Sequence, residues 1–109
     1  MKRSFGSLPN GHETFLYTIT CGGITAKVTD FGAALVSLEV PDSHGNMDDV
    51  VLGYDDCSGY LRDTCFLGSV VGRNANRIKG GRFSLNGRDI ILPTNEGNNN
   101  LHSGPEYYH

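Results

Sequence analysis

Apolar and polar residues alternate in several short runs of this sequence, and glycine or proline follows each run. The clearest runs occupy residues 13–20, 22–32 and 33–41. Alternation with a period of two gives an extended strand one apolar face, whereas a helix needs a period near 3.6. Fifteen glycines and four prolines also disfavour long helices. We therefore predict an all-β protein that contains a meander of antiparallel strands.

The segment GRFSLNGRDIIL, residues 81–92, predicts a β-hairpin. Asn86–Gly87 is favoured in the two-residue type I′ turn, because both of its positions need a positive φ angle. The turn sets the register of the two strands, whose expected pairs are Leu85 with Arg88, Ser84 with Asp89 and Phe83 with Ile90. Phe83 and Leu85 would then share an apolar face, opposite to the face of Ser84.

Other segments predict shorter elements. Strict alternation within 33–41 places the neighbours Val36 and Ser37 on opposite faces. Two apolar segments are expected to form strands, namely DVVLG at 49–53, which would be buried, and FLGSVVGR at 66–73. Residues 55–64 predict the one helical turn, which a glycine keeps short. The end of the chain, GNNNLHSGPEYYH, is expected to contain no closing strand.

Charge and composition exclude several classes of protein. The chain has 9 Lys and Arg against 12 Asp and Glu, a net charge of −3 that argues against general nucleic-acid binding. Residues 73–88 carry five basic side chains and no acid, but they lack the interleaved aromatic rings of a base-stacking surface. The N-terminus has no signal-peptide core, and no run approaches the roughly 20 apolar residues of a membrane span. We therefore expect a cytoplasmic protein that binds neither nucleic acid nor membrane.

The cysteines and the acidic residues do not indicate a metal site. The three cysteines form no CxxC pair and are odd in number, so neither a zinc site nor a disulfide framework is expected. The acids that flank VVLGY occur as sequence neighbours, and neighbours on a strand point to opposite faces. We expect these four, Asp48, Asp49, Asp55 and Asp56, to form a solvated rim.

Two polar clusters are candidate binding sites. GRNANRIKGG, residues 72–81, includes Asn76 and Arg77, and NNNLHSG, residues 98–104, includes His102. Arginine offers a planar fork of donors, asparagine offers a donor and an acceptor, and histidine can do either near neutral pH. This combination suits neutral hydroxyl groups, which need several directed hydrogen bonds. From spacing alone, turns with solvated side chains are the more frequent explanation of such segments.

Taken together, the segments resemble the N-terminal part of the aldose 1-epimerase, or galactose mutarotase, family. The resemblance runs through TDFGAALVSLEVPDSHGNMDDVVLGYDD and GSVVGRNANRIKGGRFSLNGRDIILPTNEGNNNLHSG, within residues 13–104. The GRxxNRI and NNLHxG motifs occur in the order typical of the family, with the Asn-Gly hairpin between them. Ser103 stands where the family more often has glycine.

The resemblance implies an antiparallel β-sandwich, the galactose mutarotase-like supersandwich, of which residues 1–109 would form one partial domain as an N-terminal fragment. It implies interconversion of the α and β anomers of free aldohexoses, such as glucose and galactose, by acid–base ring opening and reclosure without metal or cofactor. Asn76, Arg77 and His102 would hold the sugar, and His102 would also assist near the ring oxygen. The family's general acid histidine and general base glutamate lie downstream, so the isolated chain is expected to be inactive.

Two other functions stay open at this stage. One is a non-catalytic sugar-binding module on the same sandwich. The other is an assembly fragment that pairs with a second chain through exposed strand edges. The remaining C-terminal part of the domain or a second chain is expected to complete the sheet.

Overall fold

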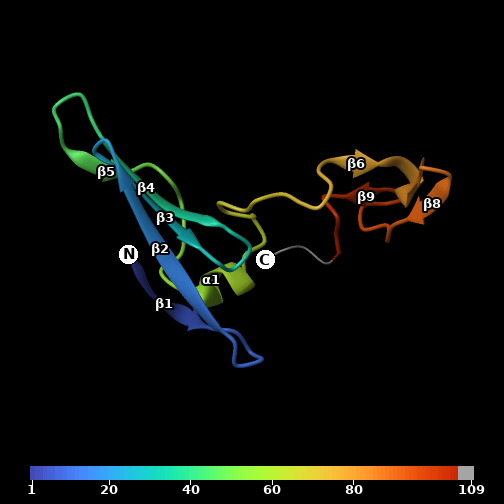
Figure 1. Ribbon diagram of the computed structural model, residues 1–109, viewed down its shortest axis with the longest axis horizontal. Coiled ribbons are helices and arrows are strands. Elements are labelled where there is room, and N and C mark those ends of the chain that lie inside the picture. The colour runs from blue at the N-terminus through green and yellow to red at the C-terminus, as the bar shows by residue number, and fades with distance from the viewer. Residues whose placement is uncertain (106–109) are drawn as a thin grey trace. The chain divides into compact units, whose positions relative to one another are not determined.

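The computed structural model describes residues 1–105, which form two compact units divided between Val70 and Val71 (Figure 1). The elements of the first unit are β1 Lys2–Ser7, β2 Glu13–Cys21, β3 Ile24–Thr29, β4 Leu35–Pro41, β5 Met47–Asp49 and α1 Cys57–Leu61. Those of the second unit are β6 Arg77–Ile78, β7 Arg82–Leu85, β8 Arg88–Ile91 and β9 Asn100–Leu101. All strand pairs within 1–105 are antiparallel, which confirms the all-β prediction. That 1–109 forms a single partial domain stays a prediction.

The first unit is a five-stranded meander with the strand order β1-β2-β3-β4-β5. Its turns follow the expected chemistry. In the β4–β5 connection, the Asp42 carboxylate accepts hydrogen bonds from the backbone N–H groups of His44 (2.7 Å) and Asn46 (2.8 Å). Such local bonds fix a turn without help from the rest of the fold. The predicted meander is therefore confirmed.

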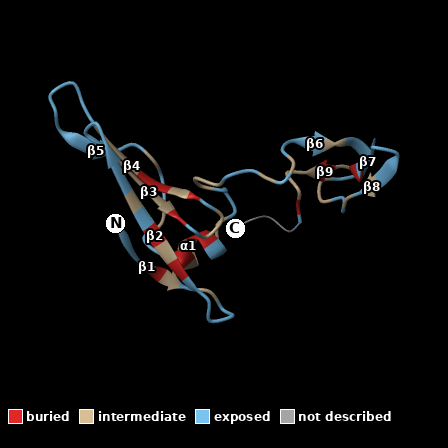
Figure 2. Ribbon diagram, in the orientation of Figure 1, coloured by how far each residue is buried: buried red, intermediate tan, exposed pale blue. Residues whose placement is uncertain are grey.

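The core of the first unit lies where α1 packs against the sheet (Figure 2). Phe5 and Leu16 come from β1 and β2, and Tyr60 comes from α1; each is at most 3% exposed. The Phe5 and Tyr60 ring centroids lie 5.9 Å apart. The helix begins at Asp56, whose carboxylate accepts the N–H groups of Ser58 and Gly59 and so satisfies two donors of its first turn. The predicted helical turn is confirmed.

A β-bulge changes the alternation expected in residues 33–41. Lys27 pairs with Ser37 but Val28 pairs with Leu35, so β4 contains one extra residue. Val36 and Ser37 are consequently both buried, at 9% and 5% exposure. The prediction of strict alternation through Val36 and Ser37 is wrong, because a bulge interrupts the period of two.

The two predicted strands in 49–53 and 66–73 are wrong. The Asp49 carboxylate takes the N–H groups of Leu38 and Val51 and thereby ends β5, so Leu52 is 77% exposed rather than buried. In the second segment Phe66 and Gly68 have φ angles of 58° and 63°. Left-handed residues cannot continue an extended strand.

Strands β1, β6 and β9 were not expected from the sequence. β1 has little apolar alternation, and a register shift next to Gly6 interrupts its pairing with β2. β9 lies inside the segment that was expected to hold no closing strand, so that expectation is wrong. Residues 106–109 of the same segment lie outside the described part of the chain.

The second unit contains the predicted hairpin, β7–β8. Its pairs are those expected, Arg82↔Ile91, Phe83↔Ile90, Ser84↔Asp89 and Leu85↔Arg88. Asn86 and Gly87 have φ angles of 49° and 74°, as a type I′ turn requires. Arg82 and Asp89 form an ion pair on the polar face. The hairpin prediction is therefore confirmed in register and turn.

Candidate functional site

The three predicted site residues lie together at one end of the β6–β9 pair. Arg77 is paired with Leu101 in the ladder. At the next position of the antiparallel ladder, the backbone N–H of His102 donates to the carbonyl oxygen of Asn76 at 3.0 Å. The antiparallel pairing of two segments about 25 residues apart thus places all three within one small region. Their roles in binding stay predictions.

The His102 ring is held by the backbone of Asn76. The Asn76 N–H donates to Nδ1 of His102 at 2.9 Å. A backbone N–H can only donate, so Nδ1 carries a lone pair and the proton of the neutral ring is on Nε2. The bond therefore fixes both the orientation of the half-buried ring and the atom that presents a donor to a ligand.

Arg77 is paired with Glu96, which the sequence analysis did not identify. The Nε–H lies 2.8–2.9 Å from the two carboxylate oxygens, and Nη2 also donates to Oε1. Hydrogen bonding to Arg77 lowers the pKa of Glu96, and the same bonds raise the pKa of Arg77. Both side chains remain accessible, at 54% and 38% exposure. The negative charge of Glu96 thereby balances the positive charge of Arg77.

Asn100 connects the segments around the site. It is completely buried and donates through Nδ2 to the carbonyl oxygens of Pro93 (2.8 Å) and Gly104 (2.9 Å). Its Oδ1 accepts from Nδ2 of Asn74 at 3.1 Å. Asn100 therefore holds the shape of the loop, as expected for an asparagine at a strand end.

Ser103 adds a second link between the two motifs. Its hydroxyl accepts the Asn74 N–H at 2.8 Å and lies 3.1 Å from the Asn74 carbonyl oxygen. Ser103 has a φ angle of 66°. A positive φ favours glycine, so serine is an uncommon residue in this conformation. Serine accepts this conformation here and gains the contacts to Asn74.

Left-handed backbone conformations also occur at this place. Asn76, His102 and Ser103 all have φ angles between 51° and 66°. Non-glycine residues seldom adopt the left-handed region, and such residues cluster at binding and catalytic sites. These conformations coincide with the predicted binding residues.

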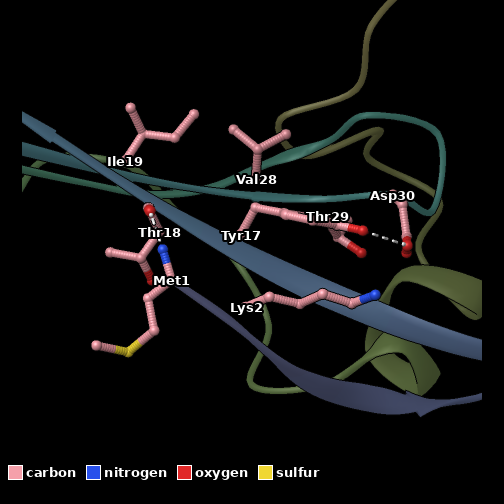
Figure 3. A pocket seen from close by; sticks show the side chains of 8 residues that line it. All are labelled: Met1, Lys2, Tyr17, Thr18, Ile19, Val28, Thr29 and Asp30. Carbon is pink, nitrogen blue, oxygen red and sulfur yellow. Dashed lines mark hydrogen bonds between the residues drawn. The ribbon is translucent and has the colours of Figure 1, made fainter.

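A separate apolar groove lies on the sheet of the first unit (Figure 3). It is open, has a volume of about 730 Å³, and is lined in part by Tyr17, Ile19 and Val28. Pairing of Tyr17 with Val28 and of Ile19 with Ala26 puts these side chains on one face of the sheet. Ile19 is 58% exposed. None of the three predicted site residues lines this groove.

The described residues contain few features of other site types. Within 1–105, no group of three or more His, Cys, Asp or Glu side chains is arranged to hold a metal ion. No helix in that part of the chain is long and apolar enough to cross a membrane.

Sequence reasoning missed Glu96 and the central role of Asn100. Glu96 could have been identified as an acid that follows the basic stretch 73–88, just after the predicted hairpin reverses the chain direction. Asn100 had no local signal that separated it from Asn98 and Asn99, because only burial distinguishes the three.

Several curated proteins resemble this chain over most of its length. A probable aldose 1-epimerase of Arthroderma benhamiae is 44% identical over 85% of this chain and 22% of its own length. The galactose mutarotase of Bos taurus is 41% identical over 92% of this chain and 30% of its own, and the aldose 1-epimerase of Escherichia coli 35% over 90% and 29%. The chain thus spans less than a third of the length of these relatives.

Solved structures and a family model agree with the sequence relatives. A GalM/aldose epimerase homologue from C. elegans superposes with a TM-score of 0.74 at 36% identity, over 84% of this chain and 29% of the other. The galactose 1-epimerase of Lactobacillus acidophilus gives 0.72 at 25% identity, over 94% and 29%. The predicted galactose mutarotase-like fold is confirmed. Because the aldose 1-epimerase family model also matches residues 16–107, this chain belongs to the aldose 1-epimerase family.

Proposed function

We propose that this chain is the sugar-holding part of an aldose 1-epimerase, which interconverts the α and β anomers of a neutral aldohexose such as galactose or glucose. The observation that carries the proposal is the mutual bonding of Asn76 and His102 beside the Arg77–Glu96 pair. Family membership supplies the class of reaction, since relatives bear the names galactose mutarotase and aldose 1-epimerase.

The chemistry of the three side chains supports binding of a neutral polyhydroxylated ring. Nε2–H of the neutral His102 ring can donate to a ring or hydroxyl oxygen, because Nδ1 is already engaged. Of the five guanidinium N–H groups, Glu96 engages Nε–H and one on Nη2, so the others can donate to hydroxyl groups. The exposed Asn76 amide has both a donor and an acceptor.

We place the groups that move protons in the reaction outside these 109 residues. Ring opening removes a proton from the anomeric hydroxyl and delivers one to the ring oxygen. Glu96 is the carboxylate bonded to Arg77, and its lowered pKa makes it a weak base. His102 would orient the ring oxygen and assist there. The proposal requires a separate general base and general acid, as in the rest of the family.

The apolar face of the first unit supports a further part of the proposal. Tyr17, Ile19 and Ile24 are between 38% and 58% exposed. Apolar side chains gathered on a sheet face are normally covered by a second layer. We propose that another part of the sandwich, in the same protein or in a second chain, covers this face.

The binding proposal predicts a loss of sugar affinity on Arg77→Lys. Lysine has no planar fork, so it cannot bond Glu96 and a sugar hydroxyl in the same geometry. Titration of the 15N-labelled chain with D-galactose, followed by the amide shifts of Asn76 and His102, is expected to give an at least severalfold larger Kd for the variant. Arg82→Lys is the matched control, because Arg82 is also exposed and ion-paired but lies in the hairpin. Equal Kd values for Arg77→Lys and the wild type would contradict the assignment.

Polarimetry tests the catalytic part independently. Freshly dissolved α-D-galactose should mutarotate at the buffer rate in the presence of the 109-residue chain, even at concentrations that saturate the amide shifts. Acceleration above that rate would show that the chain contains its own acid and base. Saturable binding without acceleration is the expected result.

A further inference from the structure

We propose that Glu96 makes this site selective for neutral aldoses over anionic sugars, such as uronates and sugar phosphates. The inference rests on the proposed function, in which Arg77 contacts the sugar. It goes further because it assigns a specificity role to a residue that transfers no proton and acts on the sugar only by way of Arg77. The observation is the two-point contact between the Glu96 carboxylate and the Nε and Nη2 atoms of Arg77.

An unpaired Arg77 would favour anions. Arginine binds carboxylates and phosphates through two parallel N–H bonds, and this geometry is stronger than a bond to a neutral hydroxyl. Residues 73–88 carry four other basic side chains and no acid, which would add positive charge near Arg77, although Arg82 is paired with Asp89. Glu96 supplies the missing negative charge at the position where an anionic ligand group would otherwise sit.

The backbone holds Glu96 in this position. Glu96 and Asn99 form an isolated bridge, in which the Asn99 N–H donates to the Glu96 carbonyl at 2.9 Å and the Glu96 N–H donates to Asn99 at 3.2 Å. The carboxylate is therefore presented by a closed turn rather than by a free loop. Its pKa is lowered, first by the bonds from Arg77, so the negative charge is fully present at neutral pH.

The Arg77–Glu96 pair can therefore discriminate by charge while it still donates to a sugar. The accessible N–H groups of Arg77 remain able to bond hydroxyl oxygens. A second carboxylate or a phosphate that approached the same guanidinium would meet the negative charge of Glu96. Two negative charges bound to the same guanidinium group repel each other, and dissolved salt weakens this repulsion by screening it.

The test measures how strongly the chain and its variants discriminate between two sugars of the same ring shape, one neutral and one anionic. The 15N-labelled chain and its Glu96→Gln variant are titrated with D-galactose and with D-galacturonate at pH 7 and low ionic strength. The ratio of the galacturonate Kd to the galactose Kd is recorded for each. Glutamine keeps an oxygen acceptor for Nε–H but removes the charge. We expect this ratio to be about two- to fivefold lower in Glu96→Gln, which corresponds to the range that exposed ion pairs contribute. The shift should shrink in 0.5 M NaCl.

Matched variants separate charge from shape and place. Asp89→Asn frees Arg82 in the hairpin and changes the net charge by the same amount, so its ratio should equal that of the wild type. Glu96→Asp keeps the charge and should retain the preference for galactose. Glu96→Ala should shift the ratio in the same direction as Glu96→Gln, which guards against an effect of the amide itself.

The outcomes distinguish this inference from the proposed function. If the wild-type amides of Asn76 and His102 do not respond to galactose, the proposed function fails and this inference fails with it. If they respond but Glu96→Gln and Glu96→Ala leave the ratio unchanged, only the specificity role is overturned. An equal shift in Asp89→Asn would also overturn it, because the effect would then be general charge and not the Glu96 contact.

Discussion

Asn100→Leu is expected to destabilise the second unit by about 1.5–4.5 kcal/mol. Asn100 is completely buried, and leucine has the same number and branching of side-chain heavy atoms but no polar atom. The substitution removes two hydrogen bonds to backbone carbonyls and one from Asn74. What is lost depends on whether water can replace each bond.

The magnitude follows from the surroundings of the three partners. Gly104 is buried, so its carbonyl oxygen would lose its Asn100 donor, at a cost of about 1–3 kcal/mol. Pro93 is exposed, so water can reach its carbonyl and the loss is only about 0.5–1.5 kcal/mol. The partly buried Asn74 amide can turn toward solvent and adds little.

The assay is urea unfolding followed by NMR at the Leu101 and His102 amides, which report on the second unit. Asn98→Leu is the matched control, because Asn98 belongs to the same run but is exposed; its stability should change by less than about 0.5 kcal/mol. A further variant, Asn100→Asp, would place a carboxylate against two carbonyl oxygens. Burial would raise its pKa in the folded state, so its destabilisation should be full at pH 7 and should diminish as the pH falls and the carboxyl is protonated. If Asn100→Leu loses no more stability than Asn98→Leu, the inferred role of Asn100 is wrong.

Two further predictions concern the first unit and the whole chain. Gly68→Ala should destabilise more than Gly45→Ala in urea unfolding: both have a positive φ, worth roughly 1–2 kcal/mol, but a Cβ at Gly68 would lie 2.0 Å from the Leu35 carbonyl oxygen, whereas nothing lies within 4 Å at Gly45. Equal losses would refute the steric argument. Stability should also fall in acid, because hydrogen bonds lower the pKa values of several carboxyl groups, namely Asp42, Asp49, Asp56, Asp89 and Glu96. A lowered folded-state pKa stabilises above the ordinary values of 3.8 and 4.5, and this contribution is lost as the pH falls through the lowered values; a urea midpoint that stays constant from pH 5 to pH 2.5 would contradict it.

Features that depend on a few neighbouring residues were predictable from the sequence. The hairpin register followed from Asn86–Gly87, because a two-residue turn fixes which residues face each other. The strands β2 and β3 followed from the period of two, and a short helical turn was expected within 55–64, although the capping role of Asp56 was not. The motifs that hold Asn76, Arg77 and His102 were recognisable as family patterns, although their spacing alone favoured plain turns.

Features that depend on distant partners were not predictable. The apolar run at 66–73 looks like a strand, but it crosses the start of β4 in a left-handed conformation, where Leu35 donates to the Gly68 carbonyl. The bulge at Val36 exists only because β3 and β4 pair with one residue out of step. Local pattern cannot reveal either, since both are set by a neighbouring strand.

The chain by itself therefore determined its strand-rich character, its tightest turn and the residue types available to a sugar. Only the tertiary structure decided that the Asn76 backbone fixes the His102 ring and that Glu96 neutralises Arg77. The physical reason is range: side-chain periodicity and turn chemistry act over two to five residues, whereas these contacts join atoms 19 and 26 positions apart. Such pairs form only when the antiparallel return of β6 and β9 brings the two motifs together.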